Sequence, residues 1–341
     1  MAGFDLVVAG GGPAGLATAL HAVAAGMSVL VREPRDGVLD KACGEGIMPA
    51  GLAELKSLGV VPAGREILGI DYCAPGRRAR SRFRGPPGRG VRRTELHRAL
   101  RQAALAAGVP FEQTKVRSVR QQPHGLVIDG TPAGHLVVAD GLHSPLRKSL
   151  GLHRPVRGPA RYGLRQHLHL EPWTDRVEVH WSPHSEAYVT PVSQDEVGIA
   201  ILTSRRAPFD EQLAEFDQLR AQLRGAPVAS TVRGAGPMHQ ASRRRVAGRA
   251  LLVGDAAGYV DAVTGEGVSL ALTQARAAVA AIAADEPNSY ERSWRASVRS
   301  HRILTKALVT VGASPLRPYL VPAAQRAPWL FAAAVNQVSR V

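Results

Sequence analysis

The sequence predicts an α/β fold: a nucleotide-binding, three-layer βαβ domain with an inserted lobe of antiparallel strands and a helical C-terminus. The apolar run Phe4–Ala9 leads into a glycine-rich turn and an Ala-rich helix, which is typical of the first strand and helix of such a domain. Strands of the same buried character return at 28–31, 136–139 and 250–253. Segments of alternating character fill 160–204 between them, so the nucleotide domain is expected to be discontinuous.

The remaining elements follow from hydrophobic spacing and from the glycines and prolines that end them. Helices are predicted at 16–25, 49–58, 94–107, 209–223, 267–284 and 290–335, the last with breaks at Pro315, Pro318 and Pro322. Strands are predicted at 28–31, 67–72, 111–119, 125–128 and 249–253. Antiparallel strands of the insertion are expected at 165–170, 177–181, 187–192 and 197–202.

The order of these elements predicts three parts, and 341 residues are enough for two lobes with a sizeable core. We expect the nucleotide domain to comprise 1–60, 91–155 and 245–285. The substrate-binding lobe would comprise 61–90 and 156–244, and the C-terminal helices 286–341. The basic, amphipathic stretch 294–338 is expected to pack on the core; capping the substrate cavity or touching a membrane are the alternatives.

The chain carries a formal net charge of +15, mostly from arginine. Aromatic residues make up only 5% and no nucleic-acid-binding motif is present, so we expect no nucleic-acid partner. A basic surface that attracts phosphorylated cofactors is the favoured explanation, and weak contact with a membrane surface is the alternative. The sequence leaves the oligomeric state open.

The two cysteines, Cys43 and Cys73, are too few for a disulfide framework and lack the spacing of a metal site. We therefore expect a reducing, cytoplasmic setting and no bound metal. The N-terminus lacks the basic leading region of a signal peptide, and no stretch is long and apolar enough to span a bilayer.

The first motif that carries chemistry is Gly10-Gly11-Gly12-Pro13-Ala14-Gly15, between the first strand and helix. Gly10 permits the tight turn, Gly12 lets a pyrophosphate approach the backbone, and Gly15 lets the helix pack on the strand. Glu33 ends the second strand, where its carboxylate can accept hydrogen bonds from a ribose diol. The set predicts a bound dinucleotide.

Two further motifs follow later strands. Asp140-Gly141, with Ser144 and Arg147 shortly after it, follows the strand 136–139. Gly254-Asp255 follows the strand 250–253, and Gly265 and Gly267 open the helix that contains Val268. Asp255, shortly after a buried strand, can accept a hydrogen bond from a polyol hydroxyl, and a helix N-terminus can donate amides to a negatively charged ring edge.

Together the three motifs resemble the FAD-dependent monooxygenase family typified by p-hydroxybenzoate hydroxylase, and the related geranylgeranyl reductases, over about residues 4–285. The resemblance implies that FAD is held by the three motifs. It also implies that Arg93 contacts the flavin chain and that Val116 lies on the strand that backs the adenine. NAD(P)H would be the reductant.

The leading functional hypothesis is a monooxygenase that hydroxylates a phenolic or polyketide-like aromatic small molecule, with dioxygen forming a flavin hydroperoxide. Two departures favour an alternative, an FAD-dependent reductase of isoprenoid double bonds. Gly265-Glu266-Gly267 and Cys43-Gly44-Glu45-Gly46 are closer to the geranylgeranyl reductases. A flavin-dependent halogenase and a non-catalytic flavin-binding protein are the remaining alternatives.

The candidate catalytic residues are Cys43 and Glu45, on the loop that the resemblance places near the flavin ring. Cys43 is either a proton donor that also contacts the cofactor or a small buried residue beside Gly44. His167, His180 and Tyr188 of the antiparallel strands are candidates for lining the substrate cavity; ordinary sheet residues are the alternative.

Overall fold

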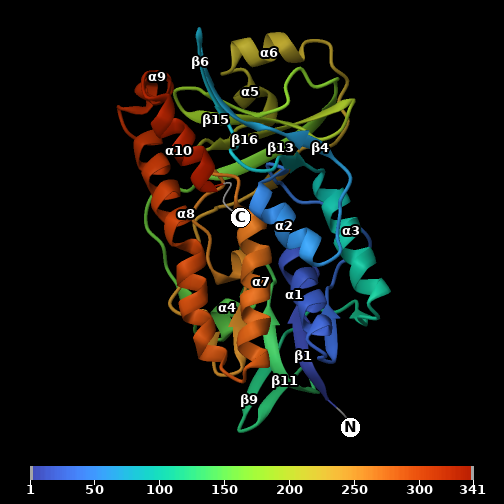
Figure 1. Ribbon diagram of the computed structural model, residues 1–341. Coiled ribbons are helices and arrows are strands. Elements are labelled where there is room, and N and C mark those ends of the chain that lie inside the picture. The colour runs from blue at the N-terminus through green and yellow to red at the C-terminus, as the bar shows by residue number, and fades with distance from the viewer. Residues whose placement is uncertain (1–2, 339–341) are drawn as a thin grey trace.

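The structure is a computed structural model that describes residues 3–338, so residues 1–2 and 339–341 of the predicted ranges lie outside the described residues. It is an α/β protein with one largely parallel sheet, one largely antiparallel sheet and a helical C-terminus, as the sequence predicts (Figure 1). The parallel sheet lies at one end of the molecule and the antiparallel sheet at the other.

The parallel sheet contains the predicted nucleotide-type strands side by side, in the order β20–β11–β1–β2–β8. Its central strands are largely apolar because helices and loops cover both faces. The carboxyl ends of β1, β11 and β20 therefore meet at one edge. Its strands are β1 (Phe4–Ala9), β2 (Val29–Arg32), β8 (Phe111–Glu112), β9 (Val119–Gln122), β10 (Gly125–Ile128), β11 (Thr131–Val138), β19 (Val246–Ala247) and β20 (Ala250–Leu252).

The antiparallel sheet runs in the order β17–β13–β16–β15–β14–β5–β6, and only the β14–β5 pair is parallel. Apolar side chains of α5 and α6 cover one of its faces. Its strands are β5 (Gly69–Ala74), β6 (Arg77–Arg82), β13 (Tyr162–His169), β14 (Val177–Trp181), β15 (Ser185–Pro191), β16 (Glu196–Thr203) and β17 (Arg233–Ala235). Two small sheets contain β3 (Gly46–Ile47), β4 (Arg65–Ile67) and β7 (Gly88–Gly90), and β12 (His153–Arg154) with β18 (Ala241–Ser242).

Helix α1 packs on β1 and β2 with α3 on one side and α7 on the other, and α8 lies beside α7 (Figure 1). Helices α9 and α10 pack against β6, so the C-terminus reaches the antiparallel sheet. The helices are α1 (Pro13–Ala24), α2 (Pro49–Ser57), α3 (Arg93–Ala106), α4 (Pro145–Ser149), α5 (Phe209–Leu213), α6 (Asp217–Leu223), α7 (Gly267–Ala283), α8 (Tyr290–Gly312), α9 (Leu320–Arg326) and α10 (Pro328–Val338), with short 3₁₀ turns at η1 (Gly254–Ala257), η2 (Pro287–Ser289) and η3 (Arg317–Tyr319).

Three predicted elements differ from the structure. The strand expected at 67–72 is divided between β4 and β5, which belong to different sheets. The strand expected at 111–119 is only β8, and Val116 lies buried in the loop that follows, because the carboxylate of Asp129 binds the amides of Arg117 and Ser118 in place of a neighbouring strand. The helix expected at 209–223 is broken into α5 and α6, because Phe216 adopts a non-helical conformation that buries its ring.

His97, on α3, joins this helix to the first glycine turn. Its Nδ1 accepts a hydrogen bond from the amide of Leu39 at 3.2 Å, and its Nε2 donates to the carbonyl oxygen of Gly11 at 3.0 Å. This is the neutral form of the ring. Burial, with a smaller contribution from the guanidinium of Arg93, lowers the pKa of His97 to about 4. An uncharged imidazole thus fixes the turn.

Acidification should therefore destabilise the fold through His97. Its pKa is 6.5 in the reference state and about 4 when folded, so its stabilising contribution is complete above pH 6.5 and is lost as the pH falls toward 4. In the wild type, His97 should lower the free energy of unfolding by about 1–2 kcal/mol between pH 7 and pH 5, as measured by urea unfolding. In His97→Gln this part of the decrease should be absent.

The exposed His124 provides the matched control, since His124→Gln should leave the pH dependence as in the wild type. An unchanged pH dependence in His97→Gln would show that the ring is not held in its neutral form.

Candidate functional site

The glycine turn after β1 has the geometry of a dinucleotide-binding turn. Gly10 has a φ of 113°, which favours glycine, and a Cβ added to Gly15 would lie 1.8 Å from the carbonyl oxygen of Gly10. A Cβ added to Gly12 would meet no atom within 4 Å. Gly10 and Gly15 therefore shape the turn, while open space lies in front of Gly12 at the N-terminus of α1.

Glu33 lies at the end of β2, as predicted, and is buried. Its Oε2 accepts a hydrogen bond from the amide of Gly11 at 2.9 Å, and its Oε1 accepts one from Nε of Arg35 at 2.7 Å. Burial acts to raise the pKa of Glu33, but these hydrogen bonds outweigh it and hold the pKa below the usual value. The carboxylate is thus a fixed acceptor beside the turn.

Arg147 joins the second motif to the third. Its guanidinium is fully buried and donates to the carbonyl oxygens of Leu142 and Ala256, both at 3.1 Å, and to Oε1 of Gln240 at 2.8 Å. The hydroxyl of Ser144 accepts a hydrogen bond from the amide of Arg147 and begins α4. The Asp140 and Gly254 motifs are therefore held together by a side chain rather than only by their neighbouring strands.

The three motifs converge on one cavity of about 510 Å³. The predicted residues that line it are Gly12, Pro13, Ala14, Cys43, Glu45, Arg93, Gly141, Gly254, Asp255, Gly265, Gly267, Val268 and Tyr188. Gly10, Gly15, Glu33, Val116 and Asp140 are not among its lining residues in the described part of the chain. Lys41 also lines it. Sequence reasoning assigned no role to Lys41, although it stands two residues before Cys43, and the supporting His97 was missed because it belongs to no spaced motif.

Two charged side chains show what the cavity can hold. Nη1 of Arg93 is buried there without a hydrogen-bond partner, which is costly unless a ligand supplies an acceptor. Asp255 also lines the cavity, and burial raises the pKa of its carboxyl despite the nearby cations of Lys41 and Arg93. An unpaired guanidinium, a carboxylate and the space at Gly12 fit the phosphates and hydroxyls of a dinucleotide such as FAD.

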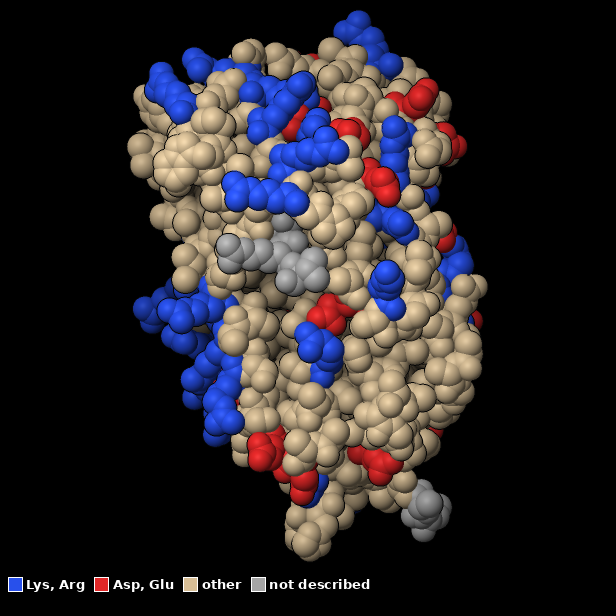
Figure 2. Space-filling view, in the orientation of Figure 1, with Lys and Arg blue, Asp and Glu red and all other residues tan. Residues whose placement is uncertain are grey.

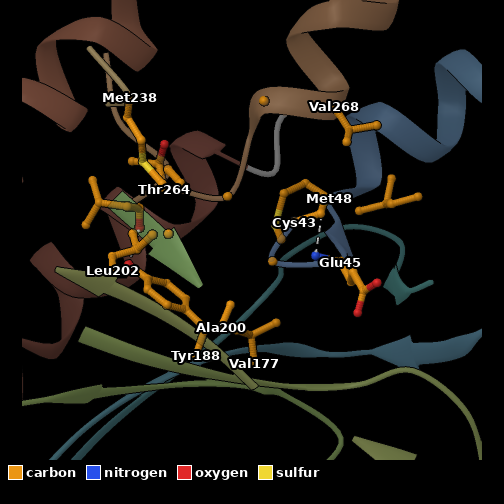
Figure 3. Close-up of a pocket in the computed structure, with 18 of the residues that line it drawn as sticks. Cys43, Glu45, Met48, Val177, Tyr188, Ala200, Leu202, Met238, Thr264 and Val268 are labelled. Carbon is orange, nitrogen blue, oxygen red and sulfur yellow. Dashed lines mark hydrogen bonds between the residues drawn. The ribbon is translucent and has the colours of Figure 1, made fainter. Parts of the chain in front are cut away.

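The loop that contains Cys43 is held by Glu45. Glu45 has a φ of 59°, and its buried carboxylate points away from the other labelled cavity residues (Figure 3). Oε1 accepts a hydrogen bond from the amide of Arg93 at 2.7 Å, at the N-terminus of α3, and Oε2 lies 2.5 Å from Nε2 of His167. Nδ1 of His167 lies 2.8 Å from the hydroxyl of Ser230. Glu45 therefore connects the start of α3 to β13 of the antiparallel sheet.

Cys43 lines the cavity on this loop, and its Sγ accepts a hydrogen bond from the amide of Glu45 at 3.4 Å. Burial raises the pKa of the Cys43 thiol, and the charge of Glu45 adds to this effect. At neutral pH the side chain is consequently a thiol, which can donate a proton, rather than a nucleophilic thiolate.

The structure separates the three predicted substrate residues. Tyr188 lines the cavity, and its hydroxyl donates to the carbonyl oxygen of Val263 at 3.0 Å. His167 lies on the same sheet face but further along β13, where Glu45 covers it, so it supports the loop instead. The prediction that His180 shares this cavity is corrected, because Val179 pairs with Tyr188 and the next residue of β14 points to the opposite face.

His180 lines a second cavity of about 1010 Å³, whose wall also includes residues of α6 and α8. Cys73, Glu178 and His180 offer ligand atoms within 4.8 Å of one another there. The carboxylate of Glu178 is already bound by Nη1 of Arg78 at 2.5 Å and by Nε2 of His180 at 3.0 Å. The cluster is therefore an internally paired group, and we assign no metal to it.

The remainder of the first cavity is apolar. Its wall on the antiparallel sheet consists of alternate residues of neighbouring strands, and α8, α9 and α10 close the other side (Figure 3). These lining residues include Ile70, Val177, Val179, Ala200, Leu202, Met238, Leu304, Leu308, Leu320, Phe331 and Val335. The C-terminal helices thus pack on the core and also cap the cavity.

Comparisons with known proteins agree with this geometry. A family model described as an FAD binding domain matches residues 4–288. The chain is 31% identical over 331 residues to a menaquinone reductase of Mycolicibacterium smegmatis, covering 87% of this chain and 80% of that protein. It is 26% identical over 330 residues to a digeranylgeranylglycerophospholipid reductase of Methanothrix thermoacetophila, covering 86% and 83%.

Among solved structures, a flavin-dependent brominase superposes with a TM-score of 0.82 at 16% sequence identity, covering 99% of this chain and 95% of that one. This likeness shows the fold alone. The family match and the reductase relatives, taken with the three motifs around one cavity, settle the class of the protein. The chain belongs to the FAD-binding domain family, within the superfamily of FAD-dependent monooxygenases and geranylgeranyl reductases, and is an FAD-dependent oxidoreductase.

Proposed function

We propose that the protein reduces carbon–carbon double bonds in the isoprenoid chain of a lipid, with FAD reduced by NAD(P)H. The observation that carries this proposal is the apolar cavity, which runs from the Cys43 loop to the C-terminal helices. Aliphatic walls favour an extended hydrocarbon chain because burial of apolar surface is the main driving force available there.

The names of the relatives support the same substrate class. One relative is named for menaquinone, a quinone with an isoprenoid tail, and the other for a lipid with geranylgeranyl chains. Both names end in reductase. The Gly-Glu-Gly sequence before α7 and the Cys-Gly-Glu-Gly sequence at 43–46 agree with this assignment.

The residues around the first cavity would hold FAD. Gly12 and the N-terminus of α1 would face the pyrophosphate, Glu33 the ribose and Asp255 the ribityl or pyrophosphate region. Arg93 would contact the flavin chain, and the amides that begin α7 at Gly267 and Val268 would face the ring edge. Once reduced by NAD(P)H, the bound FAD would supply a hydride to one carbon of the double bond.

The chain itself would supply the proton and the dry environment. Cys43 would donate its thiol proton to the second carbon, so that the double bond is replaced by two new C–H bonds and the thiolate recovers a proton from solvent. Glu45 acts as a positioning residue, since its carboxylate holds the loop from behind. The apolar wall would exclude water from the reacting carbons.

The hydroxylase hypothesis ranks second on the same geometry. A phenolic substrate needs hydrogen-bonding partners for its hydroxyl once it is buried. The hydroxyl of Tyr188, one of the few polar groups among the apolar walls, already donates to the carbonyl oxygen of Val263. The two reactions differ in their need for dioxygen, which provides the test.

Anaerobic turnover decides between them. We expect the FAD-loaded protein, supplied with NADPH or NADH and a polyprenyl lipid such as menaquinone, to form a product heavier by two hydrogen masses per reduced double bond, as measured by mass spectrometry. Dithionite in place of NAD(P)H tests the lipid half-reaction separately. Product that forms only with dioxygen and contains an added oxygen atom would overturn the reductase proposal.

Cys43→Ala should lower the rate of double-bond reduction by about 10²–10⁴-fold, the contribution typical of a positioned general acid. The rate at which NAD(P)H bleaches the flavin should change little, because the thiol acts after that step. Cys73→Ser is the matched control, since Cys73 lines the second cavity rather than the first. An undiminished rate of lipid reduction in Cys43→Ala would remove Cys43 from the mechanism.

Gly12→Ala should weaken FAD binding about tenfold or more without loss of folding stability, because the added methyl group meets only the space proposed for the pyrophosphate. Isothermal titration with FAD and thermal unfolding of the FAD-free protein measure the two effects. Gly85→Ala is the control: its Cβ also meets nothing within 4 Å, but in an exposed loop. Equal FAD affinity in both variants would place the pyrophosphate elsewhere.

A further inference from the structure

The C-terminal helices present an unusually apolar surface. Leu316, Tyr319, Trp329 and Leu330 are exposed by 59%, 64%, 68% and 53%. Leu316 and Tyr319 lie directly before α9, and Trp329 and Leu330 lie on α10. We call these four residues the docking face. In Figure 2 the surface over α9 and α10 is largely tan and is bordered by blue side chains. Large aromatic and aliphatic side chains gathered at one surface indicate a contact with another apolar phase.

Basic residues border the docking face, and the two chain segments that form its edge contain no acidic residue. The sequence contains no Asp or Glu between 72 and 94, and none after Glu291. The two acid-free segments meet in the fold, because Nε2 of Gln325 donates to the carbonyl oxygen of Arg78 at 3.0 Å, which ties α9 to β6. The exposed Arg80, Arg82 and Arg84 follow along this edge. The surface therefore has the charge that an anionic partner requires.

The first cavity opens onto the docking face. Leu330 belongs to the docking face and also lines the cavity, and the exposed Ala323 of α9 lines it as well. A molecule that leaves the docking face can therefore enter between α9 and α10 and reach the interior. The interior end of the same cavity contains Cys43 and Val268 (Figure 3).

We propose that the docking face binds the surface of an anionic phospholipid bilayer and that lipid chains pass from the bilayer into the cavity between α9 and α10. Trp and Tyr favour the membrane interface, leucine side chains enter the acyl region, and arginines attract anionic headgroups. No helix in the described part of the chain is long and apolar enough to cross a membrane, so the contact is peripheral. The nature of the lipid that enters rests on the proposed function, but bilayer binding does not.

The protein contains its own reporter for this contact. Of the four tryptophans, Trp181 and Trp294 are buried and Trp173 is half-buried, whereas Trp329 is 68% exposed. The FAD-loaded protein should sediment with phosphatidylglycerol vesicles and less with phosphatidylcholine vesicles. Lipids brominated on the acyl chain should quench its tryptophan fluorescence. This quenching should be absent when the Trp329→Phe variant binds the same vesicles.

Substitutions separate the apolar from the electrostatic contribution. The double variant Trp329→Ser/Leu330→Ser should lower the vesicle partition coefficient at least about tenfold. Replacement of Arg80, Arg82 and Arg84 by Gln should lower it about fivefold per residue and remove most of the salt dependence. The matched controls are Leu105→Ser on α3 and Arg120→Gln on β9, both exposed and distant from α9 and α10 (Figure 1).

Three outcomes overturn the proposal: no binding to phosphatidylglycerol vesicles, equal binding by the docking-face variant and the controls, or salt-sensitive binding without quenching of Trp329. The last outcome would mean that the protein adsorbs to the vesicles by charge alone, as it would to a polyanion such as heparin. Because none of these measurements requires turnover, their failure leaves the reductase proposal standing. Conversely, failed anaerobic turnover with a detergent-solubilised lipid leaves bilayer binding standing.

Discussion

The arrangement of the site depends on one buried carboxylate. Glu45 accepts a hydrogen bond from the amide of Arg93, which begins α3 beside the parallel sheet, and it contacts His167 on a strand of the antiparallel sheet. A buried charge is costly unless it is fully paired, so this joint is stable in one geometry. That geometry gives Glu45 its left-handed backbone and turns Cys43 toward the cavity.

From this joint the molecule extends in two directions. Toward the parallel sheet, the ends of β1, β11 and β20 bring backbone donors and Asp255 to the cavity, and the start of α3 adds the guanidinium of Arg93. Toward the C-terminus, the cavity becomes apolar and opens at Leu330. A charged half suited to a dinucleotide thus meets an apolar half suited to a hydrocarbon chain, and the Cys43 loop lies at the boundary. Under the proposed function, the hydride donor and the proton donor would face the same short segment of substrate.

The sequence predicted those features that local patterns determine. Strand, glycine turn and helix follow one another within a few residues, so the FAD motifs and the strands β1, β11 and β20 could be located directly. The side of the sheet to which a residue points could not be predicted, because it depends on strand pairing. The register of β14 with β15 directs His180 to the second cavity. Val116 lies in a loop because the distant Asp129 binds the neighbouring amides. His97 lacks a motif altogether, and its role arises from packing against Gly11.

A double-mutant cycle between Glu45 and His167 tests the central claim most directly. Glu45→Gln, His167→Gln and the double variant would be compared by urea unfolding and by the single-turnover rate of lipid reduction with dithionite-reduced protein. If Glu45 and His167 form one joint, their coupling energy in unfolding should be about 0.5–3 kcal/mol. Each single variant should then slow lipid reduction as much as the double variant does. Additive effects in both measurements would contradict it, because Glu45 and His167 would then support the Cys43 loop independently.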